Sequence, residues 1–276
     1  MSLNVAIIGC GAIGQVITQS IERGSAGEGI RIVGVFDIIQ EKANYFAKIL
    51  KTPFKIYNTF SELIHDPEVT LVVEAASQEA VREYAVEVIR FKKDLMVLSV
   101  GAFSDDLLFS KIQKLANMNH RKIYIPSGAI LGLDGVKSAA IGTLTSVNLI
   151  TRKPVRTLET SKYVLDNKIS LNELSEPITL YEGTARDAAK NFPKSVNVSM
   201  ILSLAGIGAD RTIVKVIADP TIAENIHEIH IKGDFGEAIT RSENIPCPEN
   251  PKTSYLAALS AVRTLKNIST HVCIGA

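Results

Sequence analysis

Three glycines near the start of the chain have the spacing of a phosphate-binding loop. They stand in Gly9-Cys10-Gly11-Ala12-Ile13-Gly14, after the apolar run Val5-Ala6-Ile7-Ile8 and before an amphipathic stretch. This order predicts a strand, a tight turn at Gly9 and a helix, with Gly11 admitting a pyrophosphate and Gly14 letting the helix pack on the strand. The phosphates would then lie on the unpaired N–H groups at the helix start, around Ala12 and Ile13.

An acidic residue follows the next predicted strand. Residues 30–36 are a buried-strand pattern that ends in Asp37, about 20 residues beyond the glycines, where a dinucleotide-binding domain places a carboxylate on the ribose hydroxyls. The alternative is that Asp37 caps the helix that follows it. A carboxylate here would repel a 2′-phosphate, which favours NAD over NADP, although Lys42 nearby keeps NADP open as a second cofactor.

Small residues follow another predicted strand of this region. Residues 70–74 form a short apolar run, and Ala75, Ala76 and Ser77 come directly after it. Ligands of parallel sheets bind beyond the carboxyl ends of the strands, where small residues leave them room. We therefore expect these three residues to contact the cofactor, with Ser77 also capping the helix that begins at Gln78.

Two of the five histidines lie close together, in residues 225–232. If this segment is a strand, His227 shares a face with Ile229 and Ile231, and His230 points to the opposite face and to water. A histidine on an apolar face is either a hydrogen-bonded core residue or a proton-transfer group. Burial would lower its pKa and a substrate carboxylate would raise it.

Lys252, Thr253 and Ser254 stand just before a predicted helix. In one interpretation they form a solvated polar turn; in the other, the ammonium, the hydroxyls and the free N–H groups of the helix start bind an anionic substrate. Asn197, on a predicted inner helix, could bind a nicotinamide amide or a ribose, or be held by backbone partners. No cluster of His, Cys or acidic residues has the spacing of a metal site.

Composition narrows the class of protein. The chain has 276 residues, of which 46% are hydrophobic, and its 30 basic and 29 acidic residues give a net charge of +1 without charge blocks. Nothing therefore indicates a nucleic-acid or membrane-surface partner, and small-molecule chemistry is the default. The three cysteines form no Cys-x-x-Cys pair, and the N-terminus has no leader pattern, which together predict a cytoplasmic protein.

The elements that must position these residues form two domains. Strand and helix patterns alternate over residues 1–125, and this predicts an α/β fold, a doubly wound parallel sheet of the Rossmann type. The helix predicted over residues 255–265 has the apolar pattern of one that packs back on this domain, so residues 246–276 are assigned to it as well. The capping pattern of Thr59 and Glu62, and Ser104 before two acids, mark further helix starts.

Residues 126–245 predict a second, α+β domain for substrate binding and oligomerisation. Its strand-like runs, at residues 143–151, 212–217, 226–232 and 237–242, are joined by one clear helix at residues 195–204. This predicts an open mixed or antiparallel sheet with helices on one face. The uncovered face favours a homodimer.

The motifs resemble, nearly end to end, those of the L-aspartate dehydrogenases. Besides the glycine loop, the matching segments are Val73-Glu74-Ala75-Ala76-Ser77, Ser99-Val100-Gly101-Ala102, Pro126-Ser127-Gly128-Ala129-Ile130, Glu182-Gly183-Thr184-Ala185-Arg186, Phe192-Pro193 with Val196-Asn197-Val198, Asn225-Ile226-His227-Glu228-Ile229, Gly233-Asp234-Phe235-Gly236 and Asn250-Pro251-Lys252-Thr253-Ser254.

The resemblance implies NAD(P)-dependent oxidative deamination of L-aspartate through iminosuccinate. The product would become oxaloacetate and ammonia or serve as a precursor of nicotinamide cofactors. By position, His227 matches the family's active-site histidine, and Asn197 and Ala129 match its cofactor contacts. Lys252, Thr253 and Ser254, supported by Ser127 and Gly128, are the residues we expect on the substrate carboxylates.

Two other functions are consistent with the same residues. One is a two-domain dehydrogenase of another small substrate, and the other is a non-catalytic dinucleotide sensor. A substrate panel followed by nicotinamide fluorescence separates them. The enzyme interpretation requires that the second domain's sheet bring the His227 imidazole to the opening of the nucleotide crevice.

Overall fold

The computed structural model describes residues 3–172, 174–192, 197–247, 250–272 and 274–275, without the side chains of residues 250–252. The chain divides into two compact units, Met1–Pro126 with Ala257–Ala276, and Ser127–Leu256. Residues 246–256, which the sequence assigns to the first domain, group with the second unit.

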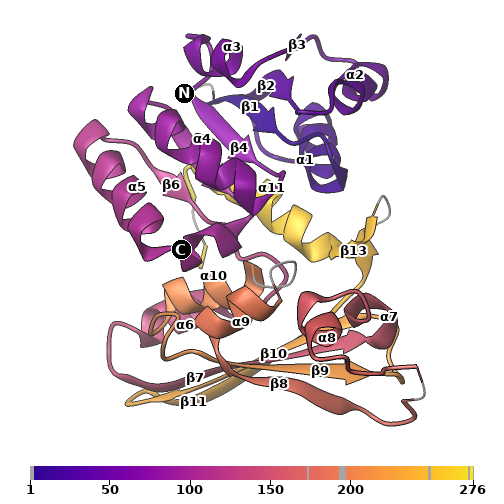
Figure 1. Ribbon diagram of the computed structural model, residues 1–276. Helices are drawn as coiled ribbons and strands as arrows, with labels where there is room; N and C mark the ends of the chain where they lie inside the picture. Colours follow the sequence, from indigo (N-terminus) through magenta and orange to yellow (C-terminus); the bar gives the residue numbers. More distant parts are fainter. Residues whose placement is uncertain (1–2, 173, 193–196, 248–249, 273, 276) are drawn as a thin grey trace. The chain divides into compact units, whose positions relative to one another are not determined.

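The first unit contains a parallel sheet. Within the described residues it has six strands in the order β3-β2-β1-β4-β5-β6 (Figure 1). The strands are β1 (Leu3–Ile8), β2 (Ile30–Phe36), β3 (Lys55–Ile56), β4 (Leu71–Glu74), β5 (Asp94–Val97) and β6 (Ile123–Tyr124). The strand order changes direction between β1 and β4, and the carboxyl ends of these strands are where such sheets bind nucleotides. The predicted doubly wound fold is confirmed.

Helices cover both faces of this sheet. The buried cluster on one face includes residues of α1 (Ala12–Glu22), α2 (Gln40–Ile49) and α11 (Tyr255–Ser269). The other face carries α3 (Phe60–His65), α4 (Gln78–Arg90) and α5 (Asp106–Asn119), with the 3-10 helix η1 (Val100–Ser104) before α5. Val262 and Leu265, two residues of the predicted apolar pattern of the tail, lie in the first cluster with Ala261. Leu259 of the same pattern is 39% exposed instead.

Side chains begin three of these helices. Thr59 accepts a hydrogen bond from the Glu62 N–H, and Ser77 accepts one from the Ala80 N–H, as predicted. Ser104 is not the cap of α5: its hydroxyl donates to the Gly101 carbonyl, and Asp105 accepts from the N–H groups of Leu107 and Leu108. At the positive end of a helix, the Asp105 carboxylate is a better hydrogen-bond acceptor than the Ser104 hydroxyl.

The second unit is built on a mixed sheet. Its five described strands are β7 (Leu144–Pro154), β8 (Ile178–Thr184), β9 (Ile213–Asp219), β10 (Asn225–Gly233) and β11 (Gly236–Asn244), in the order β11-β10-β7-β9-β8. Only β7 and β9 run parallel. Strand β8 was not predicted from the sequence, because this edge strand carries Glu182, Gly183 and Thr184 where a buried strand would be apolar.

One face of this sheet is covered by helices. They are α6 (Leu133–Ala139), α7 (Val155–Leu158), α8 (Lys162–Asp166), α9 (Ala185–Asn191) and α10 (Asn197–Ala205), and all lie on the same side of the strands in Figure 1. Buried Val147 and Leu149 of β7 and Ile229 and Ile231 of β10 face them, as strand alternation requires. The opposite face has no helix among the described residues.

A short hairpin follows the sheet. It consists of β12 (Pro246–Cys247) and β13 (Asn250–Ser254), and Ser254 pairs with Pro246. The polar turn expected at residues 252–254 is therefore strand. The first N–H of α11, on Tyr255, donates to the Ile245 carbonyl at 3.0 Å, so it is not free to bind an anion. Among the described residues, no helix is long and apolar enough to cross a membrane.

Candidate active site

The glycine loop joins β1 to α1 as its spacing predicts. Gly9 has a φ of +100°, and a Cβ on it would lie 2.7 Å from the Ala75 carbonyl carbon, so no larger residue fits. A Cβ on Gly14 would collide with the Gly9 carbonyl oxygen, whereas one on Gly11 would meet nothing within 4 Å. Gly9 and Gly14 are thus needed for packing, and Gly11 leaves space above the loop.

This space suits the pyrophosphate of a dinucleotide. Gly11 is the N-cap of α1 and has no side-chain cap, and the first turn carries no acidic residue. The N–H groups of Ala12 and Ile13 begin the helix there, and such N–H groups with the positive end of the helix dipole bind phosphate. Gly11, Ala12 and Ile13 would therefore hold the phosphates.

Asp37 lies at the end of β2 beside this loop. One of its carboxylate oxygens accepts a hydrogen bond from the Cys10 N–H at 2.8 Å, and the other accepts one from the Ile39 N–H at 2.8 Å. The N-cap of α2 is Ile39, so Asp37 is not itself the N-cap residue. Each carboxylate oxygen keeps a second lone pair for a ribose hydroxyl.

Glu74 organises the loop that contains Ala75, Ala76 and Ser77. Its side chain is 2% exposed. It accepts hydrogen bonds from the N–H groups of Ala76 and Leu98 and from the N–H and hydroxyl of Ser99, at 2.7 to 3.2 Å. Burial raises the pKa of this carboxyl, and the hydrogen bonds oppose the rise. This role of Glu74 was not predicted from the sequence, although Glu74 is the last residue of β4, directly before the small residues.

His227 lies on the helix-covered face of β10 and is 6% exposed. Its Nδ1 is 3.1 Å from the hydroxyl oxygen of Thr151, which pairs with it across β7. Burial, with a second contribution from the charge of Lys153, lowers the pKa of His227 to about 3. The imidazole is therefore neutral at pH 7, the form that accepts a proton. His230 is half-buried on the other face, 3.4 Å from a carboxylate oxygen of Glu228.

Ser127 and Gly128, the expected substrate contacts, and Ala129, an expected cofactor contact, lie in the same unit as His227. Ser242, which pairs with His227 across β11, donates its hydroxyl to the Ala129 carbonyl at 3.0 Å. The Asn244 amide donates to the same carbonyl at 3.2 Å. Gly128 has a φ of +66°, and Ser127 is half-buried. The loop is thus tied to the strand beside His227, which fits a loop that lines a ligand site.

The structure gives fewer contacts for the remaining candidate residues, Asn197 and residues 252–254. Asn197 is half-buried at the first residue of α10, on the same side of the sheet as His227. Thr253 is half-buried and Ser254 buried, both in β13. The Lys252 side chain lies outside the described residues, so its predicted role stays a prediction. Among the described residues, no group of three or more His, Cys, Asp or Glu side chains could hold a metal ion.

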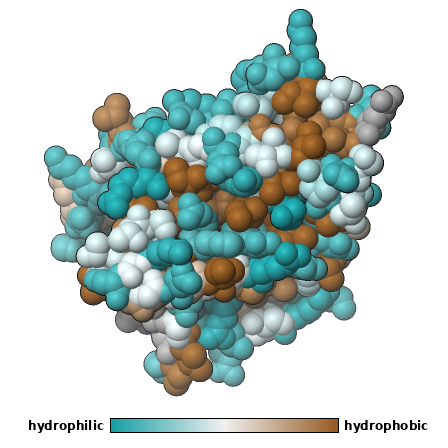
Figure 2. Space-filling model, turned by 90° about the horizontal axis from the view of Figure 1, so that it is seen from below, coloured by the Kyte–Doolittle hydropathy of each residue, from teal (hydrophilic) through white to brown (hydrophobic). Residues whose placement is uncertain are grey.

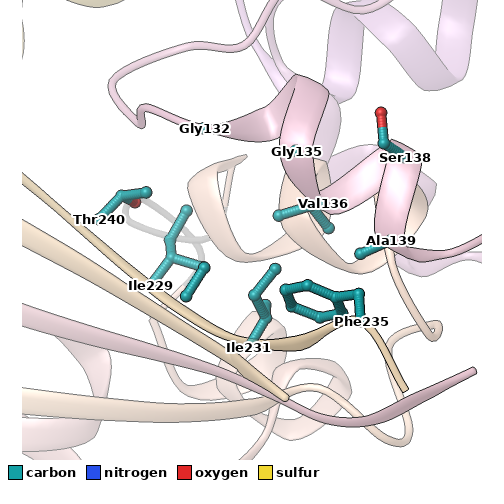
Figure 3. Close-up of a pocket in the computed structure, with 10 residues that line it drawn as sticks. Gly132, Gly135, Val136, Ser138, Ala139, Ile229, Ile231, Phe235 and Thr240 are labelled. Atoms are coloured by element: carbon teal, nitrogen blue, oxygen red, sulfur yellow. The ribbon is translucent and has the colours of Figure 1, made fainter. Parts of the chain in front are cut away.

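The apolar hollow in Figure 3 is not suited to a charged substrate. It has a volume of about 370 Å³ and is open to solvent, between α6 and the strands β10 and β11. Ile229, Ile231, Val136 and Phe235 line it. A dicarboxylate there would lose its water without gaining cationic partners. The polar groups around His227 are therefore the better candidate for the substrate site.

Together, the parallel sheet with its glycine loop and the second unit with its buried imidazole define a two-domain, dinucleotide-dependent oxidoreductase. Residues 9–126 match the model of the homoserine dehydrogenase NAD-binding domain, and residues 134–268 match that of the C-terminal domain of aspartate dehydrogenase. The chain is 46% identical to L-aspartate dehydrogenase of Methanosarcina mazei over 99% of both chains, and 42% identical to that of Methanothermobacter thermautotrophicus over 98% of both.

Comparison with solved structures gives the same family. The crystal structure of aspartate dehydrogenase from Thermotoga maritima superimposes with a TM-score of 0.77 at 27% identity, over 99% of this chain and 100% of that one. The chain belongs to the L-aspartate dehydrogenase family.

Proposed function

We propose that this enzyme catalyses the NAD(P)-dependent oxidative deamination of L-aspartate. The product would be iminosuccinate, which water converts to oxaloacetate and ammonia. The observation that carries this proposal is the buried imidazole of His227, held by Thr151, in a family whose curated members are named L-aspartate dehydrogenases. A role in supplying iminosuccinate for nicotinamide cofactor synthesis follows if the imine leaves before water attacks it.

The reaction removes a hydride from Cα and a proton from the amino group of aspartate, which leaves a C=N bond. The nicotinamide ring, when bound, accepts the hydride at C4. Hydride transfer needs Cα about 3 to 3.5 Å from C4. This function therefore requires that the cofactor held by the glycine loop and the substrate held beside His227 meet in the reacting complex.

His227 would move the protons of this reaction. When Nδ1–H donates to the Thr151 hydroxyl, Nε2 carries the lone pair and can take a proton from the amine or from the attacking water. The same nitrogen returns the proton in the reverse direction. General base catalysis of this kind contributes about 10² to 10⁴ in rate. The pKa of about 3 makes the imidazole a weak base in the free protein. The negative charge of a bound substrate carboxylate would raise this pKa towards the range in which general base catalysis is efficient.

We propose NAD as the preferred cofactor, because the Asp37 carboxylate would repel the 2′-phosphate of NADP. In the Asp37→Ser variant we expect weaker NAD binding and a smaller preference for NAD over NADP. Dissociation constants for the reduced cofactors NADH and NADPH, measured by nicotinamide fluorescence, check this. An unchanged preference would mean that Asp37 serves only its hydrogen bonds to the backbone of Cys10 and Ile39.

We further propose a homodimer that uses the open face of the second sheet. This face carries ion pairs such as Arg241 with Glu228 and Lys232 with Glu237, next to apolar side chains such as Ile239, which is 67% exposed. Figure 2 shows hydrophobic patches among hydrophilic residues on this side. Light scattering, which measures the mass of the protein in solution, tests this proposal. We expect twice the mass of one chain, and the mass of a single chain would contradict the homodimer. Among the described residues, Cys10 and Cys247 form no disulfide, which is consistent with a cytoplasmic location.

A steady-state assay with a panel of amino acids tests the activity. We expect L-aspartate alone to reduce NAD rapidly, and oxaloacetate with ammonia to oxidise NADH. Turnover of another amino acid or of a sugar in place of aspartate would contradict the proposal. Tight cofactor binding without turnover would instead indicate a sensor.

A further inference from the structure

Two polar side chains beside His227 have no role so far. Lys153 is near the end of β7, and Asn225 begins β10. In the ladder between these strands, Thr151 pairs with His227 and Arg152 pairs with Ile226. Because side chains alternate along a strand, Lys153 and Asn225 follow on the same face as Thr151 and His227. All four side chains therefore gather at one end of the helix-covered face.

Asn225 is buried there with part of its amide unsatisfied. It is 8% exposed, and its Oδ1 has no hydrogen-bond partner among the described residues. A buried acceptor without a donor costs free energy, and in native proteins such a group is completed by a water, an ion or a ligand, or serves a catalytic role. Since Oδ1 accepts only, the partner that it lacks is an N–H or O–H donor.

Lys153 adds a positive charge to the same end of the face. It lines a small cavity together with Thr151 of β7, Phe192 and Ser199. Burial lowers the pKa of Lys153 to about 8, and its charge contributes to the low pKa of His227, so the ammonium lies near the imidazole. Around this end the buried Ser242 and Asn244 are polar as well, whereas the other end of the face is apolar.

We propose that Lys153 and Asn225 form a substrate subsite beside His227, in which the Lys153 ammonium binds a carboxylate of an amino dicarboxylic acid and the Asn225 Oδ1 accepts a hydrogen bond from its amino group. This inference rests on the proposed function, since it names residues that hold the same substrate. The subsite places the amino group of the substrate next to the His227 imidazole, which takes its proton. It also supplies a cation from a described residue for one of the two carboxylates.

The Lys153→Met variant tests the cation. We expect the KM for L-aspartate to rise about 10-fold to 100-fold, as loss of a charge-assisted hydrogen bond predicts, with little change in the affinity for NAD. Lys232→Met is the matched control, because Lys232 lies in the same sheet, on the opposite face, paired with Glu237. A KM that is the same in the wild type and in Lys153→Met would overturn the proposal.

A second readout needs no turnover. In the free protein, NMR titration of the histidine rings, assigned with His227→Gln, should show a higher pKa for His227 in Lys153→Met than in the wild type or in Lys232→Met. If the ring titrates identically in all three proteins, the ammonium is not beside the imidazole and the subsite is refuted.

The Asn225→Leu variant tests the acceptor. Leucine has a similar size and carries no polar atom, so removing the unsatisfied oxygen should leave the unfolding temperature unchanged or raise it, while the KM for L-aspartate rises several-fold. A purely structural role predicts the reverse pattern, a lower unfolding temperature with an unchanged KM, and that result would refute the role of Asn225.

Succinate, a dicarboxylate without an amino group, separates the two residues. In calorimetry with the NAD-loaded protein, we expect Lys153→Met to weaken succinate binding at least 10-fold and Asn225→Leu to leave it unchanged. If wild-type protein fails to oxidise L-aspartate but binds succinate through Lys153, the proposed function is wrong and the subsite stands. If it oxidises L-aspartate and neither variant changes KM, the subsite is wrong and the function stands.

Discussion

At the scale of single residues, the environment of His227 sets its chemistry. The imidazole is buried on the helix-covered face, hydrogen-bonded to Thr151, and its pKa is lowered to about 3. An unfolded chain would protonate the same ring near pH 6.5. The folded protein therefore keeps a neutral base where water-exposed histidines begin to charge, and this must affect its stability in acid.

We predict that His227 makes the protein acid-labile. A group whose folded pKa is below its unfolded pKa binds fewer protons in the folded state, so its contribution to stability is lost as pH falls from about 6.5 towards 3. Over this range the unfolding free energy of the wild type should fall by up to about 1.4 kcal/mol per pH unit more than that of His227→Gln. Urea unfolding at several pH values measures this. Parallel pH dependences of the two proteins would show that folding does not lower the pKa of the His227 ring.

Residue roles were predicted from sequence only where a pattern marks them. The glycines and Asp37 stand at fixed spacings, and alternation put His227 on the apolar face with Ile229 and Ile231. The subsite roles proposed for Lys153 and Asn225 were not predicted, because each residue has an ordinary polar interpretation until the register of β7 and β10 is known. Pairing between distant strands is a tertiary property.

At the scale of elements, one buried carboxylate connects two loops of the first sheet. Glu74 ends β4 and binds donors from Ala76, Leu98 and Ser99. Ala76 lies in the loop after β4, and Leu98 and Ser99 lie in the loop after β5. Glu74 should therefore fix the shape of the loop with Ala75, Ala76 and Ser77, on which the expected cofactor contacts depend.

Glu74→Gln should disrupt this loop. The amide would turn an NH2 group towards N–H and O–H donors, which leaves buried groups unsatisfied at a cost of about 1 to 3 kcal/mol. We expect a lower unfolding free energy and about 10-fold weaker NAD binding. Glu83→Gln, an exposed position on α4, is the control. Wild-type stability and NAD affinity in Glu74→Gln would show that the carboxylate does not hold the loop.

The elements themselves were largely predictable. Alternating strand and helix patterns identified the first sheet, because buried parallel strands are short apolar runs. In the second unit, β8 was missed because an edge strand tolerates polar residues. The segment at residues 252–254 was expected to be a turn, and it is strand because β12 pairs with it. Both errors arise where partners in the sheet, rather than local composition, determine the structure.

At the scale of the whole molecule, the proposed function assigns one half of the reaction to each unit. The first unit would bind the dinucleotide with its glycine loop and Asp37, and the second would bind the substrate beside His227. The family relation covers both units, since the relatives match 98 to 99% of the chain. If these assignments hold, His227 acts on turnover and not on cofactor binding.

Comparing the wild type with His227→Ala tests this most directly. NAD reduction by L-aspartate and NAD binding are measured on the same preparations. We predict that turnover falls at least about 10²-fold while the dissociation constant for NAD stays within about 2-fold of the wild type. Near-wild-type turnover in His227→Ala, with the protein folded and NAD bound, would contradict the assignment of the active site.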